Sequence, residues 1–415
     1  MGTFQISSLL ICLAALFSFI NFKFIRLPST IGVMLMALGT STLLFVLGSF
    51  ARPLRIEAQS IVASVDFREA IFNGMLAFLL FAGALQMQID DLRREWKPIA
   101  VLALLGTVVS TGLVGFLCWI TFRFIGLPLS FAWCLVFGAL ISPTDPNAVL
   151  GIMRKVGAPK GLETIMAGES LFNDGVGVAI FLGVASMVVG ATAPTIPQGV
   201  LLLIREAAGG AGVGLAAGLS TYVLLKSVDN YQVEVLLTLA LAMGCYALAD
   251  AIGTSGPIAV VVAGVFIGNR GRALAMSEKT RQHVDSFWEL IEETLNAVLF
   301  LLLGLEMLVV PFRRGLVAAG VISIAVVLLA RWICVAGSFG LLSFWYRSHP
   351  GRITILTWGG LRGGLSVAMV LSLPPSQNRS LLLAITYAVV LFCVFVQGLT
   401  ASRVIRHAVR ARKPR

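Results

Sequence analysis

The chain has 415 residues, of which 58% are hydrophobic and only 12% charged, and its mean hydropathy is +0.94. Soluble globular proteins carry about 25% charged residues, so the composition excludes that class, and the apolar content also excludes a disordered chain. The formal net charge of +11 would suit a nucleic-acid partner, but the positions of the charges favour a membrane instead. We therefore predict an all-α polytopic membrane protein.

Thirteen apolar runs recur along the sequence, and a helix needs about 20 residues to cross a bilayer. The first run is interpreted as a span because no small-residue cleavage site precedes the next charge. No connection is long enough for a soluble domain, so we predict a transmembrane domain at 1–402 and a short basic tail at 403–415. The predicted spans are 4–22, 30–50, 70–88, 98–119, 131–151, 162–190, 199–225, 233–250, 256–269, 287–310, 316–345, 354–373 and 380–402.

The distribution of Lys and Arg predicts the orientation. In the connections after odd-numbered spans and in the tail they are more than twice as numerous as in the other connections, and such residues favour the cytoplasmic side. Because the number of spans is odd, we expect the N-terminus outside and the C-terminus in the cytoplasm of a multi-pass cell (inner) membrane protein. The tail is interpreted as an anchor for anionic lipid, and no nucleic-acid partner is expected.

Span 5 contains the sequence GALISPTDPNAVL, in which Pro143 and Pro146 bracket Thr144 and Asp145. Each proline lacks a backbone donor and clashes with the carbonyl four residues earlier, so the helix is expected to be interrupted here. Unwound backbone at membrane depth is tolerated only where it is buried in protein or lines a watery cavity. The freed carbonyls and the Thr144 hydroxyl are therefore candidate ligands for a cation.

Span 6 contains the sequence GESLFNDGVGVAIF, with four polar residues inside two helical turns. Glu169 and Asn173 are four residues apart, as are Ser170 and Asp174, so two polar stripes lie next to each other on one flank of the helix. Asp174 lies about 16 Å along a helix from the interfacial Glu163, close to the middle of the bilayer. A charge at that depth costs at least ~2.5–3.5 kcal/mol, which indicates a function.

Other charges fall inside apolar runs. Span 12 contains WGGLRGGLS, where glycines flank Arg362 on both sides, and so many glycines predict a second helix break. Arg331 in span 11 is the other buried cation. Glu306 in span 10 is expected to snorkel or to pair with Arg313 at the far surface, and Glu292 is interpreted as interfacial.

The two predicted breaks lie seven spans apart and therefore run in opposite directions through the membrane. Interrupted helices at corresponding positions of two inverted halves are typical of secondary transporters, with the binding site near the midplane. We predict that spans 1–6 and 8–13 form two inverted six-helix repeats joined by span 7.

The motifs SPTDP at 142–146, GESLFNDG at 168–175 and WGGLRGGLS at 358–366 resemble those of monovalent cation:proton antiporters of the NhaP/NHE type, and the likeness covers nearly the whole chain. The resemblance implies a thirteen-helix homodimer in which spans 5 and 12 are unwound and cross. It also implies a Na⁺ site formed by the backbone of Thr144 and the side chains of Ser170 and Asp174.

The resemblance further implies that Glu169 pairs with Arg362, and that Asp145 lies beside the broken helix ends. Arg362 would then be a fixed counter-charge that holds spans 6 and 12 together, because an arginine does not lose its proton. One departure from the family pattern is Ala82 in the span 3 stretch LLFAGAL, where some archaeal relatives have a glutamate.

These residues predict a mechanism for exchange. A carboxylate removed from water binds a proton readily, and an adjacent cation favours the charged form, so Asp174 is expected to hold either H⁺ or Na⁺ (or Li⁺ or K⁺). With one titrating acid and a neutral Asn173 beside it, we expect electroneutral 1:1 exchange. No cofactor is expected, and no metal site other than that for Na⁺, because the histidines lie in charged loops or the tail, at His283, His349 and His407.

Two alternatives remain at this point. A cation channel or another proton-coupled transporter would also use broken helices, although a single titratable ligand favours stoichiometric exchange. An intramembrane aspartyl protease would need two facing aspartates, for which Asp145 and Asp174 are candidates. The sequence lacks Gly-x-Gly-Asp, however, and that reaction would leave Asn173 and Arg362 without a function, so we do not expect an enzyme.

Overall fold

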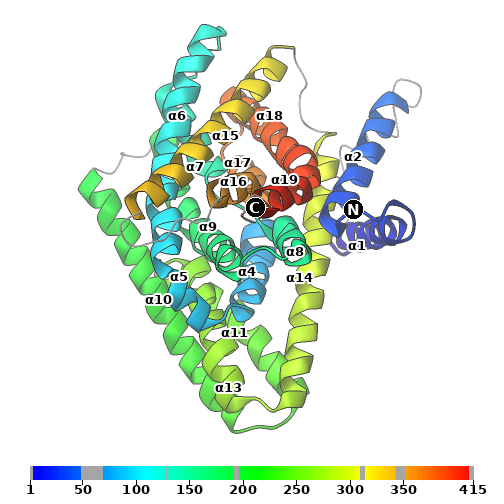
Figure 1. Ribbon diagram of the computed structural model, residues 1–415, viewed down its shortest axis with the longest axis vertical. Helices are drawn as coiled ribbons and strands as arrows, with labels where there is room; N and C mark the ends of the chain where they lie inside the picture. Colours follow the sequence, from blue (N-terminus) through cyan, green and yellow to red (C-terminus); the bar gives the residue numbers. More distant parts are fainter. Residues whose placement is uncertain are drawn as a thin grey trace.

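The computed structural model describes residues 3–47, 69–127, 129–190, 196–308, 314–342 and 351–410. Within these ranges the chain is helical apart from short connections, and it contains no strand (Figure 1). Large apolar side chains lie on the outside, including Phe22 and Phe124, which are 85% and 86% exposed. Lipid is the natural solvent for such a surface, and the prediction of an all-α polytopic membrane fold is confirmed.

The helices follow one another along the chain with short connections. The first part of the chain forms α1 (Thr3–Ile20), α2 (Ser29–Leu47), α4 (Leu76–Leu85), α5 (Ile89–Ala100), α6 (Thr107–Phe124), α7 (Phe131–Ile141), α8 (Asn147–Val156), α9 (Lys160–Val189) and α10 (Ile196–Lys226). The second part forms α11 (Tyr231–Ile252), α12 (Gly256–Phe266), α13 (Arg272–Ala275), α14 (Glu278–Glu306), α15 (Arg314–Leu341), α16 (Arg352–Gly359), α17 (Gly364–Leu371), α18 (Gln377–Leu391) and α19 (Leu399–Arg410). Wider π-helical turns occur at Asn21–Ile25, Glu69–Met75, Val101–Gly106, Ile267–Gly271 and Phe392–Gly398.

Local sequence signals set several helix ends. Gly157, Gly190 and Gly253 adopt left-handed backbone angles directly after α8, α9 and α11, a conformation that glycine adopts without strain. Asn230 and Ser277 accept hydrogen bonds from free backbone N–H groups at the starts of α11 and α14, as polar N-cap residues do. The connections between these helices are therefore short and specified by the sequence itself.

Where the structure describes them, the predicted spans each fall on one helix or on consecutive helices. Among the described residues, nine helices are long and apolar enough to cross a membrane, or ten if α16 and α17 together form one span. The count of thirteen therefore stays a prediction, as does the inverted-repeat relationship. Residues 403–410 of the predicted tail belong to α19, whereas 411–415 lie outside the described residues.

The two predicted helix breaks are confirmed. Residues 142–146 are not helical and separate α7 from α8. Residues 360–363 separate α16 from α17, and the axes of these two helices differ by 44°. Both broken helices lie in the middle of the molecule, among the other helices (Figure 1).

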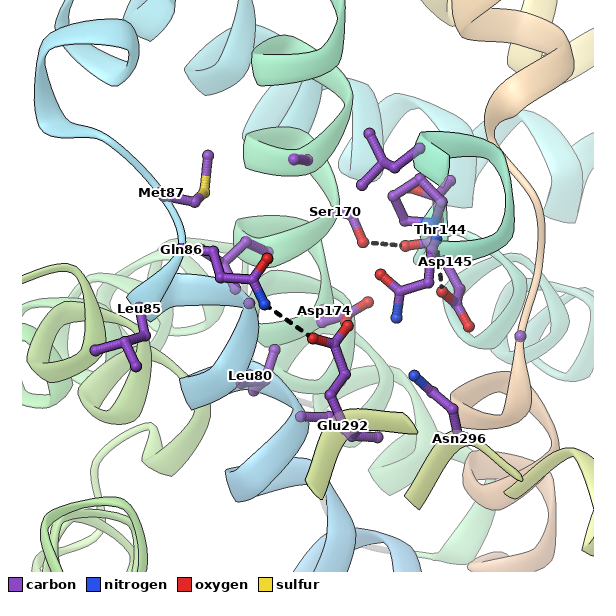
Figure 2. Close-up of a pocket in the computed structure, with 18 of the residues that line it drawn as sticks. Leu80, Leu85, Gln86, Met87, Thr144, Asp145, Ser170, Asp174, Glu292 and Asn296 are labelled. Atoms are coloured by element: carbon purple, nitrogen blue, oxygen red, sulfur yellow. Dashed lines mark hydrogen bonds between the residues drawn. The ribbon is translucent and has the colours of Figure 1, made fainter. Parts of the chain in front are cut away.

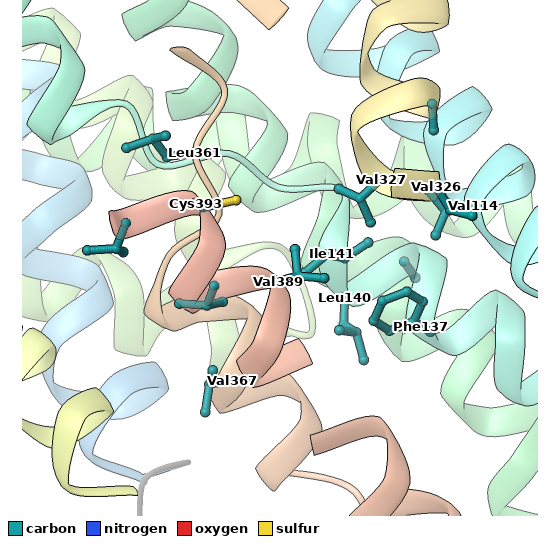
Figure 3. Packing of buried hydrophobic residues seen from close by; sticks show 14 of the residues in the cluster. Val114, Phe137, Leu140, Ile141, Val326, Val327, Leu361, Val367, Val389 and Cys393 are labelled. Atoms are coloured by element: carbon teal, nitrogen blue, oxygen red, sulfur yellow. The ribbon is translucent and has the colours of Figure 1, made fainter. Parts of the chain in front are cut away.

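A packed hydrophobic core surrounds α7, the half-helix that leads into the first break. Figure 3 shows Phe137 and Ile141 among apolar side chains that include Val114 of α6 and Val327 of α15. α6 and α7 approach so closely that a Cβ at Gly138 would lie 2.2 Å from the Thr111 carbonyl oxygen. Small residues permit such backbone contact between membrane helices, and the result is a rigid wall on one side of the break.

Candidate ion-exchange site

The two breaks contact each other directly. The backbone N–H of Asp145 in the first break donates a hydrogen bond to the carbonyl of Leu361 in the second, at 2.8 Å. Arg362, 2% exposed, donates through Nη1 to the carbonyls of Ser142 and Pro143, the latter at 2.8 Å. Arg362 therefore satisfies backbone acceptors left free where α7 ends, as a buried chain requires.

Polar residues of α9 hold the first break from the opposite side. The Ser170 hydroxyl donates to the Thr144 carbonyl. The Asn173 amide donates to Thr144 Oγ1 at 2.9 Å, and its oxygen accepts from the Thr144 N–H at 3.3 Å. This contact needs Gly177, because a Cβ there would lie 2.3 Å from Cγ of Pro143. Asn173 thus fixes the conformation of Thr144 and is itself 1% exposed.

A cavity of about 790 Å³ opens beside the break. Thr144, Asp145, Ser170 and Asp174 line it, and Figure 2 shows these four side chains gathered around the same space. The structure therefore brings four of the five predicted ion-binding residues into one cavity. The fifth, Asn173, lies behind its wall.

The two aspartates of the cavity differ in what holds them. Asp145 accepts a hydrogen bond from the Asn147 N–H at 3.2 Å, so its carboxylate is held at the start of α8, where a negative charge is stabilising. Within the described part of the chain, no hydrogen bond or ion pair engages the Asp174 carboxylate. Asp174 is therefore the acid that is free to exchange ligands.

The cavity leads from the break to one end of the helix bundle. Its outer residues include Arg154, Lys160 and Glu163, and also Arg272 and Asp285. All five belong to connections and helix ends on the side that the distribution of positive charge predicts to be cytoplasmic. On the opposite side of the break lies the packed core around α7.

The predicted ion pair of Glu169 with Arg362 is wrong. Glu169 pairs instead with Arg331 of α15, with two guanidinium nitrogens facing two carboxylate oxygens, the longer contact being 2.9 Å. Arg331 also donates to the Leu356 carbonyl, at 3.3 Å from Nε and 3.0 Å from Nη2. The physical reason is that Arg362 is already held by the free carbonyls at the end of α7.

Other candidates also have a defined place. Glu306 is buried at the end of α14 and does not line the cavity, and its predicted partner Arg313 lies outside the described residues. Ala82 is buried in the apolar packing of α4.

Glu292, interpreted from the sequence as interfacial, instead lines the cavity and accepts a hydrogen bond from Gln86 at 3.2 Å. Gln86 could not be predicted from the sequence, since an isolated glutamine at a helix end is common on any surface.

The ligand chemistry of the cavity favours a hard cation. It offers the Thr144 carbonyl, the hydroxyls of Thr144 and Ser170, and the carboxylate of Asp174, all of them oxygen ligands. Among the residues that the structure describes, no group of three or more His, Cys, Asp or Glu is placed to hold a metal ion. A site with one free carboxylate suits a monovalent ion that must also leave.

Two broken helices that meet at a polar cavity inside an all-α membrane protein define the class of secondary transporters. Residues 9–407 match the family described as sodium/hydrogen exchanger, transmembrane, and the chain belongs to this family. The Na(+)/H(+) antiporter NhaP of Pseudomonas aeruginosa is 46% identical over 401 residues, covering 95% of each chain. The Na(+)/H(+) antiporter NhaH of Halobacillus aidingensis is 35% identical over 396 residues, covering 92% of this chain and 93% of that protein.

A solved structure has the same fold. The sodium proton antiporter MjNhaP1 from Methanocaldococcus jannaschii superposes with a TM-score of 0.75 over 97% of both chains, at 20% sequence identity. The resemblance to this family inferred from the motifs is thus confirmed over nearly the full length of the chain.

Proposed function

We propose that the protein exchanges Na⁺ for H⁺ across a cell membrane as a secondary active transporter, with Li⁺ and K⁺ as further candidate cations. The observation that carries the proposal is Asp174, a carboxylate without a protein partner in the described structure, which lines a cavity beside two broken helices that contact each other. Two relatives at 46% and 35% identity are named Na(+)/H(+) antiporters, which supports the same activity here.

Competition for one carboxylate couples the two ions. Asp174 binds either a proton or a cation. The Ser170 hydroxyl and the Thr144 oxygens supply further ligands to the bound cation. Arg331 and Arg362 keep their protons and act as fixed charges, so a site with one titrating acid moves one H⁺ for each Na⁺ and transfers no net charge. Such a cycle requires no chemical step and no cofactor.

Alternating access requires the site to face one side at a time. The cavity reaches Lys160 and Arg272, and we assign this side to the cytoplasm from the distribution of positive charge. The structure then represents an inward-facing state, with the core around α7 closing the outer side. The N-terminus would lie outside, the C-terminus inside, and the protein would act as a homodimer like that implied by the family resemblance.

The test is transport by the purified protein in sealed proteoliposomes that contain a pH-sensitive dye. With an imposed pH gradient and no applied voltage, adding Na⁺, Li⁺ and K⁺ in turn should dequench the dye for the ions that exchange. A channel would give proton movement only when voltage or a counter-ion pathway allows it. Absence of cation-dependent dequenching for all three ions would contradict the proposal.

A further inference from the structure

We infer that Glu292 and Asn296 of α14 form an approach site, at which a cation is held in the cavity before it reaches Asp174. The inference rests on the proposed exchange function and extends it to residues outside the two broken helices. Both side chains line the cavity that contains Asp174, and Figure 2 shows them pointing into it from α14.

The first observation concerns depth along α14. Asp285, Glu289, Glu292 and Glu293 all line the cavity, and α14 begins at Glu278, on the side where the cavity is open. Because a helix rises 1.5 Å per residue, Glu292 lies about 10 Å further along the helix than Asp285. Glu292 and Glu293 are therefore the deepest carboxylates that α14 contributes to the cavity, and Glu292 is the less exposed of the two.

The second observation is that Glu292 is held in place. Gln86 at the end of α4 donates to its Oε2 at 3.2 Å, whereas its neighbour Glu293 is exposed. An amide that donates to a carboxylate stabilises the charged form of that carboxylate. The hydrogen bond also leaves Oε1 of Gln86 as a further acceptor near Glu292.

The third observation is an unused amide. Asn296 is only 7% exposed, lines the cavity, and has no side-chain hydrogen bond to any residue that the structure describes. The amide faces the cavity and is therefore available to a water molecule or a cation there. Asn296 follows Glu292 by four residues, which places both on one face of α14.

Together these groups offer a carboxylate and amide oxygens to a cation that still retains part of its water shell. Such a site raises the local cation concentration next to Asp174 without binding a transported proton. It should therefore affect how much Na⁺ is needed for exchange, and leave the maximal rate nearly unchanged.

The experiment measures Na⁺-driven dequenching in proteoliposomes over a range of Na⁺ concentrations for Glu292→Gln and, as a control, Glu278→Gln. The two variants lose the same charge on α14, but Glu278 is at the exposed start of the helix and does not line the cavity. We expect Glu292→Gln to raise the apparent KM for Na⁺ roughly fivefold, the scale of a carboxylate acting at several ångströms, with a maximal rate within about twofold of the parent. Glu278→Gln should leave both values close to those of the parent.

Asn296→Ala provides a second measurement and should raise the apparent KM about twofold, as for loss of one uncharged ligand. An unchanged KM in Glu292→Gln would overturn the inference, and so would complete loss of exchange in a variant that is monodisperse on gel filtration, since Glu292 would then be part of the exchange step itself. Failure of the parent protein to exchange any cation would instead contradict the proposed function.

Discussion

Glu169 of α9 and Arg331 of α15 are 162 residues apart in sequence and form a bidentate ion pair inside the membrane domain. Arg331 also binds the Leu356 carbonyl near the C-terminal end of α16, just as Arg362 binds the Ser142 and Pro143 carbonyls at the end of α7. The carbonyl end of each half-helix is thus next to an arginine, and a positive charge there is stabilising.

Removing either member of this pair should destabilise the protein more than it changes ion affinity. Glu169→Gln or Arg331→Gln leaves one buried charge without its partner, which costs about 3–5 kcal/mol. The double variant should regain part of this loss, as measured by thermal unfolding in detergent. Glu169→Gln combined with Arg362→Gln should show additive losses, because these residues are not hydrogen-bonded to each other. Equal coupling in both double variants would argue against the specific pair.

Asp174→Asn should abolish exchange for every cation, because an amide neither releases a proton nor carries the charge that attracts Na⁺. The variant should remain monodisperse in detergent, since the Asp174 carboxylate makes no hydrogen bond or ion pair with the residues that the structure describes. Dequenching assays with Na⁺, Li⁺ and K⁺ provide the measurement. Retained pH-dependent Na⁺ uptake would identify a different proton carrier, with Asp145 the next candidate.

Competition between H⁺ and Na⁺ also predicts a pH dependence. When a proton must leave Asp174 before Na⁺ binds, each unit of added acidity lowers the fraction of free carboxylate by up to tenfold. The apparent KM for Na⁺ should therefore rise as the pH falls, while the maximal rate at saturating Na⁺ changes little. A KM that is independent of pH over two units would contradict binding at a shared site.

Gly177→Ala should impair both stability and exchange, since the new Cβ would lie 2.3 Å from the Pro143 ring and push α9 away from the break. Gly183→Ala on the same helix is the matched control, because its Cβ would meet no atom within 4 Å. In a helix interior this control substitution should be neutral, or stabilising by up to about 1 kcal/mol. Similar thermal shifts in both variants would show that close packing at Gly177 is unimportant.

Asn173→Asp adds an acid behind the wall of the cavity. The Thr144 N–H already donates to this side chain, so a carboxylate would still find a donor there and need not enter the transport cycle. We expect a shifted pH optimum with exchange still electroneutral. Solid-supported-membrane recordings provide the measurement, and a sustained Na⁺-driven current that is absent in the parent would show that Asn173 alone sets the stoichiometry.

The helix breaks and the polar residues around them could be predicted from the sequence because proline and glycine act locally. Pro143 and Pro146 interrupt a helix whatever surrounds it, and the spacing of Ser170 and Asp174 places them on one face. The partner of Glu169 could not be predicted in this way. Two buried arginines and one buried glutamate are consistent with either pairing, and only the packing of α15 against the broken helices decides between them.

The position of Glu292 illustrates a second limit. A glutamate near the end of a predicted span is equally consistent with the membrane surface and with a water-filled cavity. Distinguishing these requires knowing that α14 runs beside α4, a contact between segments about 200 residues apart, shown by the hydrogen bond between Gln86 and Glu292. Periodicity within one helix contains no information about that neighbour.

The arginine at the end of α7 has a consequence for ion selectivity. Because Arg362 occupies the carbonyls of Ser142 and Pro143, the break offers a cation mainly the oxygens of Thr144, far fewer than the ring of carbonyls that replaces a hydration shell in a selective channel. A cation beside Asp174 would therefore keep part of its own water. Because little of that water has to be removed, the site should discriminate weakly between small monovalent ions, and we expect Na⁺ and Li⁺ to be transported at comparable rates in the dequenching assay.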